Sequence, residues 1–486
     1  MTLDKGATRM VETWHAARLI PTSGINGPDE QERRATSALL AVLGAVREFQ
    51  RCLLGPLGAP VGSAETFIEV PFDLNGTRVF PDGLIRITRG KSVWTCLVEV
   101  KTGKNVVGSE QLDHYLDVAR ANGFQAVLTI SNEIPAQPGI HPTKVDRRKL
   151  RNVALHHLSW TKVLTEAVMQ RVHRGVSDPE QAWILGELIR YLEHPRSGAM
   201  EFEDMGAHWV TVRDAVTAGT LRPSDKGALD VANHWDQLIR YACLRLGRLL
   251  GTPVEPVLTR REMADPASRA QALATSLAQT GTLPGQLRIP NAIGPITVCA
   301  DLRAGRVMVE VQCDAPREGR PLTRVNWLLR QLKDAPPDLR IDSFAVYARE
   351  PSASALLRDV RDEPARLVGG DKKDIRAFKL VLSASSGAKR GQGRGSFIGS
   401  VLDLVDRFYE EVVQSLKPWN PPAPKLRQSA VQQPPEVQPA LVSTALSSED
   451  GAQHDEPREQ DSGSDDTRAE PDAAASVPDD AAPAEA

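Results

Sequence analysis

Cysteine is scarce in this sequence and follows no pattern that would bind zinc or form a disulfide framework. The five cysteines are odd in number, widely scattered and contain no CxxC pair: Cys52, Cys96, Cys243, Cys299 and Cys313. The first residues lack the apolar segment of a signal peptide, and no apolar run approaches the roughly 18 residues of a membrane-spanning helix. The sequence therefore predicts a soluble, cytoplasmic protein in a reducing compartment.

Acidic residues are concentrated at the C-terminal end of the chain. Residues 420–486 contain 14 acidic side chains against four basic ones, a charge of −10, whereas the whole chain carries −3. Residues 1–419 therefore carry +7. The C-terminal segment is rich in proline, alanine and serine, and it has too few apolar side chains to offset the entropy of ordering. We expect a disordered tail, which is either a solubilising extension or, less favoured, a mimic of nucleic acid.

The N-terminal part of the chain shows the pattern of a mixed α/β core. Residues 28–58 carry apolar side chains at helical spacing and predict one long helix that ends at Gly55-Pro56. Asn75-Gly76 favours a tight hairpin between two strands, because both residues tolerate a positive φ. The expected elements after the long helix are strands over 66–74, 77–87 and 93–101, a helix over 109–122 and a buried strand over 125–132.

The strand over residues 93–101 carries charges where burial is expected. Alternation places Leu97, Glu99 and Lys101 on one face of this strand. Buried charges cost several kcal/mol each unless they are paired or bind a metal. Asp82 lies at the strand-turn sequence FPDG, where it can approach the same place. Two carboxylates and one ammonium suit Mg²⁺ or Mn²⁺, which also bind phosphate oxygens, so this set indicates phosphodiester chemistry.

These residues resemble the PD-(D/E)XK nuclease superfamily, whose pattern is matched by Pro81-Asp82 followed, after a gap, by Glu99-Val100-Lys101. The resemblance implies a restriction-endonuclease-like fold and a Mg²⁺-dependent nuclease that acts on nucleic acid, most simply DNA. It implies that Asp82 and Glu99 hold the metal, with the carbonyl of Val100 as a further ligand. Lys101 would orient the attacking water or stabilise the developing charge.

The helix that follows the strand extends the resemblance. Gln111 and Tyr115 match the QxxxY element of the exonuclease-like branch, and their spacing places both on one helix face. In such enzymes this pair contacts DNA near the scissile phosphate. An acid on the preceding helix completes the site in some members. Glu32 is our candidate metal ligand, because it continues the apolar stripe that begins at Ala35, whereas Glu30 lies on the polar face.

The resemblance covers roughly residues 27–133, and each motif also has an ordinary explanation. An ExK sequence is often a solvated strand face, and PDG is often only a turn. The order and spacing of the motifs favour a nuclease in defence, repair or stress response. The alternative is a non-catalytic nucleic-acid-binding or scaffold protein that keeps the fold. The sequence leaves strandedness, endo- or exonuclease action and the oligomeric state open, a homodimer being one option.

The whole chain is expected to contain four parts: a nuclease-like domain over 1–175, a helical linker region over 176–255, a second α/β domain over 256–419 and the tail over 420–486. In the second domain a hairpin is expected around Ala304-Gly305. Asp301 precedes Glu310-Val311-Gln312 as Asp82 precedes Glu99-Val100-Lys101. The second of these sequences thus repeats the first with glutamine in place of lysine. The second domain is either a decayed copy of the first or an unrelated α/β domain, and we slightly favour the unrelated domain.

Other features of the sequence are less specific. Two basic segments, residues 144–151 and the glycine-rich residues 386–397, fit either phosphate contacts or a solvated surface. His156 and His157 are adjacent, so their side chains point apart and we assign them no metal. Four tryptophans on helix-like stretches are expected to be packing residues: Trp160, Trp183, Trp209 and Trp235.

Overall fold

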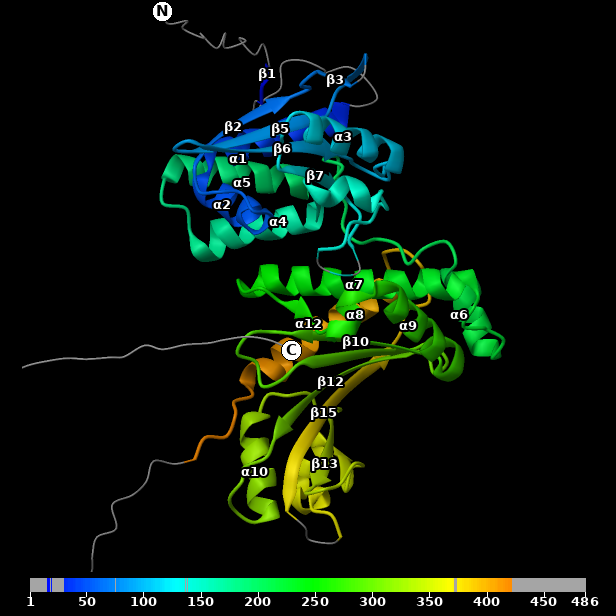
Figure 1. Cartoon of the computed structure of the whole chain (residues 1–486). Coiled ribbons are helices and arrows are strands. Elements are labelled where there is room, and N and C mark those ends of the chain that lie inside the picture. Colours follow the sequence, from blue (N-terminus) through cyan, green and yellow to red (C-terminus); the bar gives the residue numbers. More distant parts are fainter. Residues whose placement is uncertain are drawn as a thin grey trace, which may run out of the picture. The chain divides into compact units, whose positions relative to one another are not determined.

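The computed structural model of the chain describes residues 15–17, 19, 30–74, 76–135, 137, 139–370 and 374–421 (Figure 1). Asn75 of the predicted Asn75-Gly76 turn and residues 422–486 of the predicted tail lie outside this set. Within the set, no helix is long and apolar enough to cross a membrane.

The first sheet is mixed, and its order is β1-β2-β5-β6-β7-β8. Its strands are β1 (His15–Ala16), β2 (Ser63–Ile68), β5 (Gly83–Arg89), β6 (Ser92–Val100), β7 (Ala126–Ser131) and β8 (Ala154–Ser159). The first four pair antiparallel, whereas β6, β7 and β8 are parallel. Helix α3 (Ser109–Ala121) makes the crossover that the parallel pair β6–β7 requires. The predicted mixed α/β architecture is therefore confirmed. Strands β3 (Phe72–Leu74) and β4 (Thr77–Val79) form a separate hairpin around Gly76.

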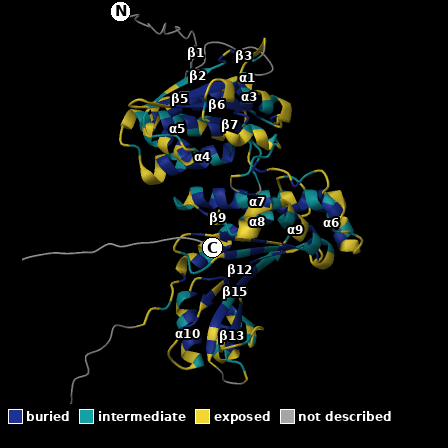
Figure 2. Ribbon diagram, in the orientation of Figure 1, coloured by how far each residue is buried: buried dark blue, intermediate teal, exposed yellow. Residues whose placement is uncertain are grey.

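Helices cover both faces of the first sheet (Figures 1 and 2). One face packs against α1 (Glu30–Ala45), α2 (Arg47–Leu54), α4 (Trp160–Val168) and α5 (Pro179–Glu193), and the other packs against α3. Cys96, Val98 and Val100 belong to the first core and Leu97 to the second, which confirms the predicted alternation along β6. The single helix predicted over residues 28–58 is wrong. Val46 is fully buried with extended dihedral angles, φ −106° and ψ 97°, and separates α1 from α2.

The second sheet is antiparallel throughout, and its order is β14-β13-β15-β12-β11-β10-β9. Its strands are β9 (Glu255–Pro256), β10 (Thr282–Arg288), β11 (Ile296–Asp301), β12 (Arg306–Asp314), β13 (Arg340–Ala345), β14 (Ala353–Leu356) and β15 (Ile375–Ser385). Helices α7 (Lys226–Leu250), α9 (Pro266–Thr280) and α12 (Phe397–Glu411) share its core. The turn between β11 and β12 contains Gly305 at φ 61°, as the predicted hairpin requires.

The second sheet differs from the first in strand order and in the position of its acids. Strand β15 lies between β12 and β13, whereas β6 and β7 are direct neighbours. Asp301 lies opposite Arg306 beside the turn, and Thr297 is the residue opposite Glu310. Asp301 therefore does not occupy the position that Asp82 has in the first sheet, because it lies at the far end of its hairpin from Glu310. Its side chain instead accepts a hydrogen bond from the Ala304 N–H at 2.8 Å.

The predicted helical linker over residues 176–255 is divided between the two cores. Helix α5 contributes Leu185 and Leu188 to the first core, whereas α6 (Trp209–Ala218) and α7 belong to the second. Trp160, Trp209 and Trp235 are buried as predicted, but Trp183 is 59% exposed and is not a packing residue. The remaining short elements are η1 (Gly55–Leu57), η2 (Arg147–Arg151), η3 (Met169–Arg174), α8 (Arg260–Ala264), α10 (Pro321–Gln331), α11 (Leu357–Asp362), η4 (Pro364–Leu367) and η5 (Val413–Ser415).

Candidate functional site

The charged residues singled out from the sequence meet at the end of β6. Asp82 directly precedes β5, and the pairing of Gly83 with Val98 brings it beside Glu99. The Val100 N–H donates a hydrogen bond of 2.7 Å to Asp82 Oδ2. Lys101 Nζ lies 2.9 Å from Glu99 Oε1. The antiparallel pairing of β5 with β6 thus brings Asp82 beside Glu99 and Lys101, although 17 positions of the chain separate Asp82 from Glu99.

Gly83, the glycine of the PDG sequence, is required by packing. A Cβ atom at this position would lie 2.4 Å from Leu40 Cδ1 on α1 and 3.2 Å from the Phe67 carbonyl oxygen. Such distances are shorter than van der Waals contact, so a side chain here would push α1 away from β5. The absence of a side chain therefore lets α1 approach the strand at the residue next to Asp82.

Glu99 is a buried carboxylate with one oxygen satisfied and the other not. Its side chain is 1% exposed. Oε1 accepts from Gln111 Nε2 at 2.7 Å and from Lys101, whereas Oε2 is buried and has no hydrogen-bond partner among the described residues. An unsatisfied buried polar group costs about 1–3 kcal/mol, and more when it is charged. Glu99 Oε2 is thus a ligand atom that the fold leaves available.

The electrostatics of the cluster favour an additional positive charge. Burial, and then the charge of Glu99, raise the pKa of Asp82 to about 8. Burial alone would lower the pKa of Lys101, but the carboxylates of Glu99 and Asp82 outweigh it and raise that pKa above its usual range. At neutral pH without a cation, Lys101 is therefore charged and Asp82 is largely protonated.

Gln111 and Tyr115 lie on α3 and face the acids. Gln111 Nε2 donates to Glu99 Oε1 and to the Tyr115 hydroxyl oxygen, which is 3.0 Å away. The Tyr115 hydroxyl in turn donates to the Phe80 carbonyl oxygen at 3.4 Å. Burial and the charge of Glu99 raise the pKa of Tyr115, so its hydroxyl stays neutral. The pair connects helix α3 to Glu99 and to the chain before Asp82, and its predicted contact with DNA stays a prediction.

Glu32 lies near the cluster but its oxygens are occupied. Oε2 lies 3.2 Å from Lys101 Nζ, and Oε1 accepts from Asn105 Nδ2 at 2.7 Å and from the Thr102 N–H at 3.4 Å. Glu30, in contrast, pairs with Arg34 one turn along α1. Glu32 therefore fixes Lys101 and the chain after β6, and its predicted role as a metal ligand stays a prediction.

Two contacts of the site were not found from the sequence. Asn105 reaches Glu32 across 73 positions of the chain, and Trp160 donates its Nε1–H to the Lys101 carbonyl oxygen at 2.9 Å. Asn105 has no motif around it, and Trp160 was predicted only as a packing residue. Neither contact leaves a local pattern, because each depends on how α1 and α4 pack against the sheet.

No family model, curated protein or solved structure matches this chain. The capacity for a metal must therefore be judged from the residues themselves. Among the described residues, no group of three or more His, Cys, Asp or Glu side chains is arranged to hold a metal ion. Asp82, Glu99 and the Val100 carbonyl remain as donors. Mg²⁺ commonly uses one or two carboxylates and keeps several waters, so this smaller set fits it.

Both predicted basic segments contain some charges that are paired and others that are exposed. In the first, Lys149 Nζ lies 2.8 Å from Asp117 on α3, and Arg148 pairs with Asp146. Lys144, Arg147 and Arg151 of that segment are exposed. In the glycine-rich segment, the Arg390 side chain pairs with Asp204 at 3.1 Å, and a β-bridge joins Lys389 to Ser396. The first segment thus offers exposed cations beside α3.

His157 takes part in a buried network of hydrogen bonds with Thr129 and Glu133. Thr129 Oγ1 lies 2.8 Å from His157 Nδ1 and 2.8 Å from His141 Nε2, and His157 Nε2 donates to the Glu133 carbonyl oxygen at 2.9 Å. Burial lowers the pKa of His157 to about 4, so the ring is neutral at pH 7. The network joins β7 and β8.

Proposed function

We propose that this chain is a metal-dependent nuclease of the PD-(D/E)XK type that hydrolyses phosphodiester bonds in DNA. The observation that carries the proposal is the buried, unpartnered Oε2 of Glu99 beside Asp82 and Lys101. Such an arrangement costs stability, because burial and Glu99 keep Asp82 from ionising and one oxygen of Glu99 lacks a donor among the described residues. Unfavourable clusters of this kind are typical of functional sites.

Asp82, Glu99 and the Val100 carbonyl would hold Mg²⁺ or Mn²⁺. When bound, the ion would polarise the scissile phosphate and lower the pKa of a water. Lys101 is held between Glu99 and Glu32, so its ammonium is a fixed positive charge that stabilises negative charge on the phosphoryl oxygens in the transition state. Gln111 keeps the Glu99 carboxylate oriented through its hydrogen bond to Oε1.

A second candidate function is binding of nucleic acid without cleavage. The exposed cations Lys144, Arg147 and Arg151 favour it. They lie on or beside η2, which contacts α3. Their positive charges attract phosphates without a metal. Both candidate functions predict binding of DNA. Only cleavage that depends on Asp82, Glu99 and Lys101 separates them.

The deciding experiment incubates the purified chain with supercoiled, linear and single-stranded DNA in Mg²⁺, Mn²⁺ or EDTA. We expect cleavage only with a metal, and a loss of about 100-fold or more in Asp82→Ala, Glu99→Ala and Lys101→Ala. Asp301→Ala is the matched control, since it removes an acid beside a strand turn of the second sheet, and it should cut like the parent. Circular dichroism checks that each variant is folded.

Two results would change the assignment. If the three variants cut DNA as fast as the parent, the active site is not at β6. If the parent binds DNA but cuts none of the substrates with either metal, the non-catalytic function is correct.

A further inference from the structure

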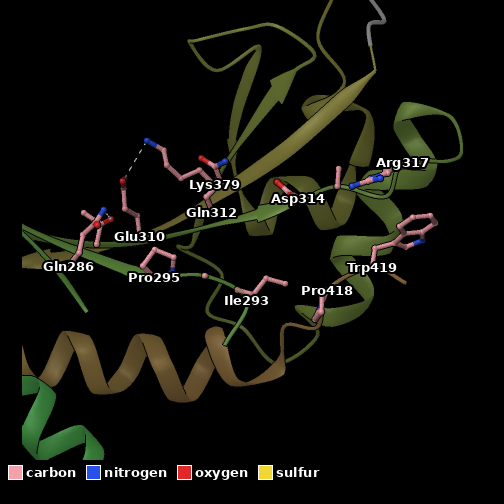
Figure 3. Close-up of a pocket in the computed structure, with 13 residues that line it drawn as sticks. Gln286, Ile293, Pro295, Glu310, Gln312, Asp314, Arg317, Lys379, Pro418 and Trp419 are labelled. Carbon is pink, nitrogen blue, oxygen red and sulfur yellow. Dashed lines mark hydrogen bonds and ion pairs between the residues drawn. The ribbon is translucent and has the colours of Figure 1, made fainter. Parts of the chain in front are cut away.

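On the second sheet, one face of β12 carries polar side chains. Along β12, Val309, Val311 and Cys313 face the buried core, whereas Glu310, Gln312 and Asp314 alternate with them on the opposite face. A pocket of about 560 Å³ lies over this polar face (Figure 3). It is lined by Gln286, Ile293, Gly294, Pro295, Thr297, Glu310, Gln312, Asp314, Ala315, Arg317, Lys379, Pro418 and Trp419.

The polar groups in this pocket are only partly used by the fold. Glu310 is paired with Lys379, whose Nζ lies 3.4 Å away. Gln286 donates to Thr297 Oγ1 at 3.0 Å. The side chains of Gln312 and Asp314 are exposed and make no hydrogen bond or ion pair with any described residue. One amide and one carboxylate, two positions apart on the same strand face, therefore remain available to a ligand.

An arginine and a tryptophan lie at one end of the pocket, and the chain around each is anchored. Figure 3 shows Arg317 and Trp419 at this end, with Asp314 and then Gln312 leading toward Lys379. Arg324 is 5% exposed and donates to the carbonyl oxygens of Arg317, at 3.1 Å, and of Gly319 and Ile375. This buried guanidinium fixes the loop that carries Arg317.

The chain before Trp419 is also anchored, at Lys417. The Lys417 N–H donates to Gln331 Oε1 at 2.7 Å, which ties the segment before Trp419 to the end of α10. The indole is half-buried, so one part packs and the rest faces the pocket. The site thus combines a half-buried aromatic side chain, an exposed guanidinium on an anchored loop and two hydrogen-bonding groups without a partner among the described residues.

We propose that this pocket binds one unpaired nucleotide. The base stacks on Trp419, and the phosphate pairs with the Arg317 guanidinium, which suits phosphate oxygens because it donates two parallel hydrogen bonds. Asp314 accepts from the exocyclic amine of the base, and Gln312 completes the base edge. Cytosine, adenine and guanine carry such an amine, but thymine does not, so the site discriminates against thymine. A base inside a duplex is stacked on both faces and paired along its Watson–Crick edge, so it cannot enter.

The bound nucleotide is either a free nucleotide or one residue of a single-stranded nucleic acid. Both present the same base and phosphate, so binding assays with dCMP, dTMP and the oligonucleotides dC12 and dT12 separate them. All assays use the full chain carrying Asp82→Asn, in EDTA, so that no cleavage occurs. Binding is then measured whether or not the chain is a nuclease, and failure of one proposal leaves the other testable.

We expect dC12 to bind several-fold more tightly than dT12, and a dC12–dG12 duplex to compete poorly. Trp419→Ala should weaken binding of dC12 about tenfold, because stacking on one aromatic side chain is lost. Trp183→Ala is the matched control, since Trp183 is an exposed tryptophan of the first sheet's helices, and it should bind like the parent. Asp314→Asn should bring the dC12 to dT12 ratio close to one.

Each outcome decides the proposal. Binding of dCMP that depends on Trp419 assigns the pocket to free nucleotides, and binding of dC12 alone assigns it to a strand. Binding that is unchanged in Trp419→Ala and Arg317→Gln, or equal for dC12 and dT12, overturns it. Absence of binding by every probe overturns it as well. Thermal unfolding of each variant shows whether a loss reflects unfolding rather than the site.

Discussion

Asp82 is the acid of the candidate site whose pKa the fold raises. Its carboxyl group is buried beside Glu99, and its pKa of about 8 lies above the ordinary value of 3.8. Below pH 3.8 the group is protonated in both the folded and the unfolded chain and contributes nothing to the difference. Between pH 3.8 and 8 the unfolded chain ionises and the folded chain does not, so stability falls as the pH rises.

Asp82→Asn should therefore stabilise the metal-free protein while abolishing cleavage. Asparagine keeps an oxygen that accepts from the Val100 N–H, and it removes the charge that Glu99 repels. In EDTA the variant should equal the parent near pH 4 and be more stable by about 1–4 kcal/mol at pH 8 and above. Urea unfolding at several pH values measures this difference. A variant that is less stable than the parent at pH 8 would show that Asp82 is ionised and well paired in the fold.

The residues that meet at β6 could be found from the sequence because their chemistry conflicts with their position. A charge within an apolar strand is visible without any structure, and alternation gives the shared side of Glu99 and Lys101. Asn105 and Trp160 could not be found in this way, since asparagine in a loop and tryptophan on a helix are common. What distinguishes them is a contact across the fold.

At the scale of elements, the types of helix and strand were predictable but some boundaries were not. Helix α3 and strand β6 begin and end within a residue of their predictions, because periodicity and capping act locally. The break at Val46 was missed, since the apolar stripe continues through it. The stripe continues because both α1 and α2 bury apolar side chains in the same core.

Helix α3 carries Gln111, which orients the carboxylate of Glu99, the proposed metal ligand. Gln111→Ala leaves Glu99 Oε1 with Lys101 as its remaining donor, so the carboxylate is less well oriented. We expect the affinity for Mn²⁺ to fall about tenfold, the lower end of the effect of residues that orient metal ligands. Tyr115→Phe keeps the Gln111–Glu99 bond and should lose less. Calorimetry with Mn²⁺ measures both.

Glu110→Ala, which changes an exposed neighbour on the same helix, is the control and should bind Mn²⁺ like the parent. If Gln111→Ala binds Mn²⁺ normally and still loses cleavage, α3 acts on DNA directly, as the resemblance to the QxxxY element implies. That result would remove Gln111 from the group of residues that orient Glu99.

At the scale of the molecule, the second sheet shows where sequence reasoning stops. The pocket over β12 is lined by residues from Gln286 to Trp419, so no single window of the sequence contains it. The order of hairpin, helix and strand is shared by both halves, but it does not specify which strands pair. That choice depends on β15, which pairs with β12 and β13 and lies far from both in the chain.

The charge distribution of the whole chain gives the last prediction. Residues 422–486 carry −10 and the rest carries +7, so the tail can compete with DNA for the same cations. Deleting residues 422–486 should tighten non-specific binding of DNA several-fold at low salt. The gain should shrink as salt rises, because the screening length falls from about 30 Å at 0.01 M to about 10 Å at 0.1 M.

Fluorescence anisotropy with a labelled duplex, in EDTA and at these two salt concentrations, measures the effect. The matched control keeps the full length of the tail and replaces its acidic residues by asparagine and glutamine. If charge is the cause, this variant binds as tightly as the deletion, whereas an effect of bulk leaves it like the parent. Affinity that is unchanged or weaker in both variants would show that the tail does not compete for the basic surface, and that the exposed cations beside α3 bind DNA independently of it.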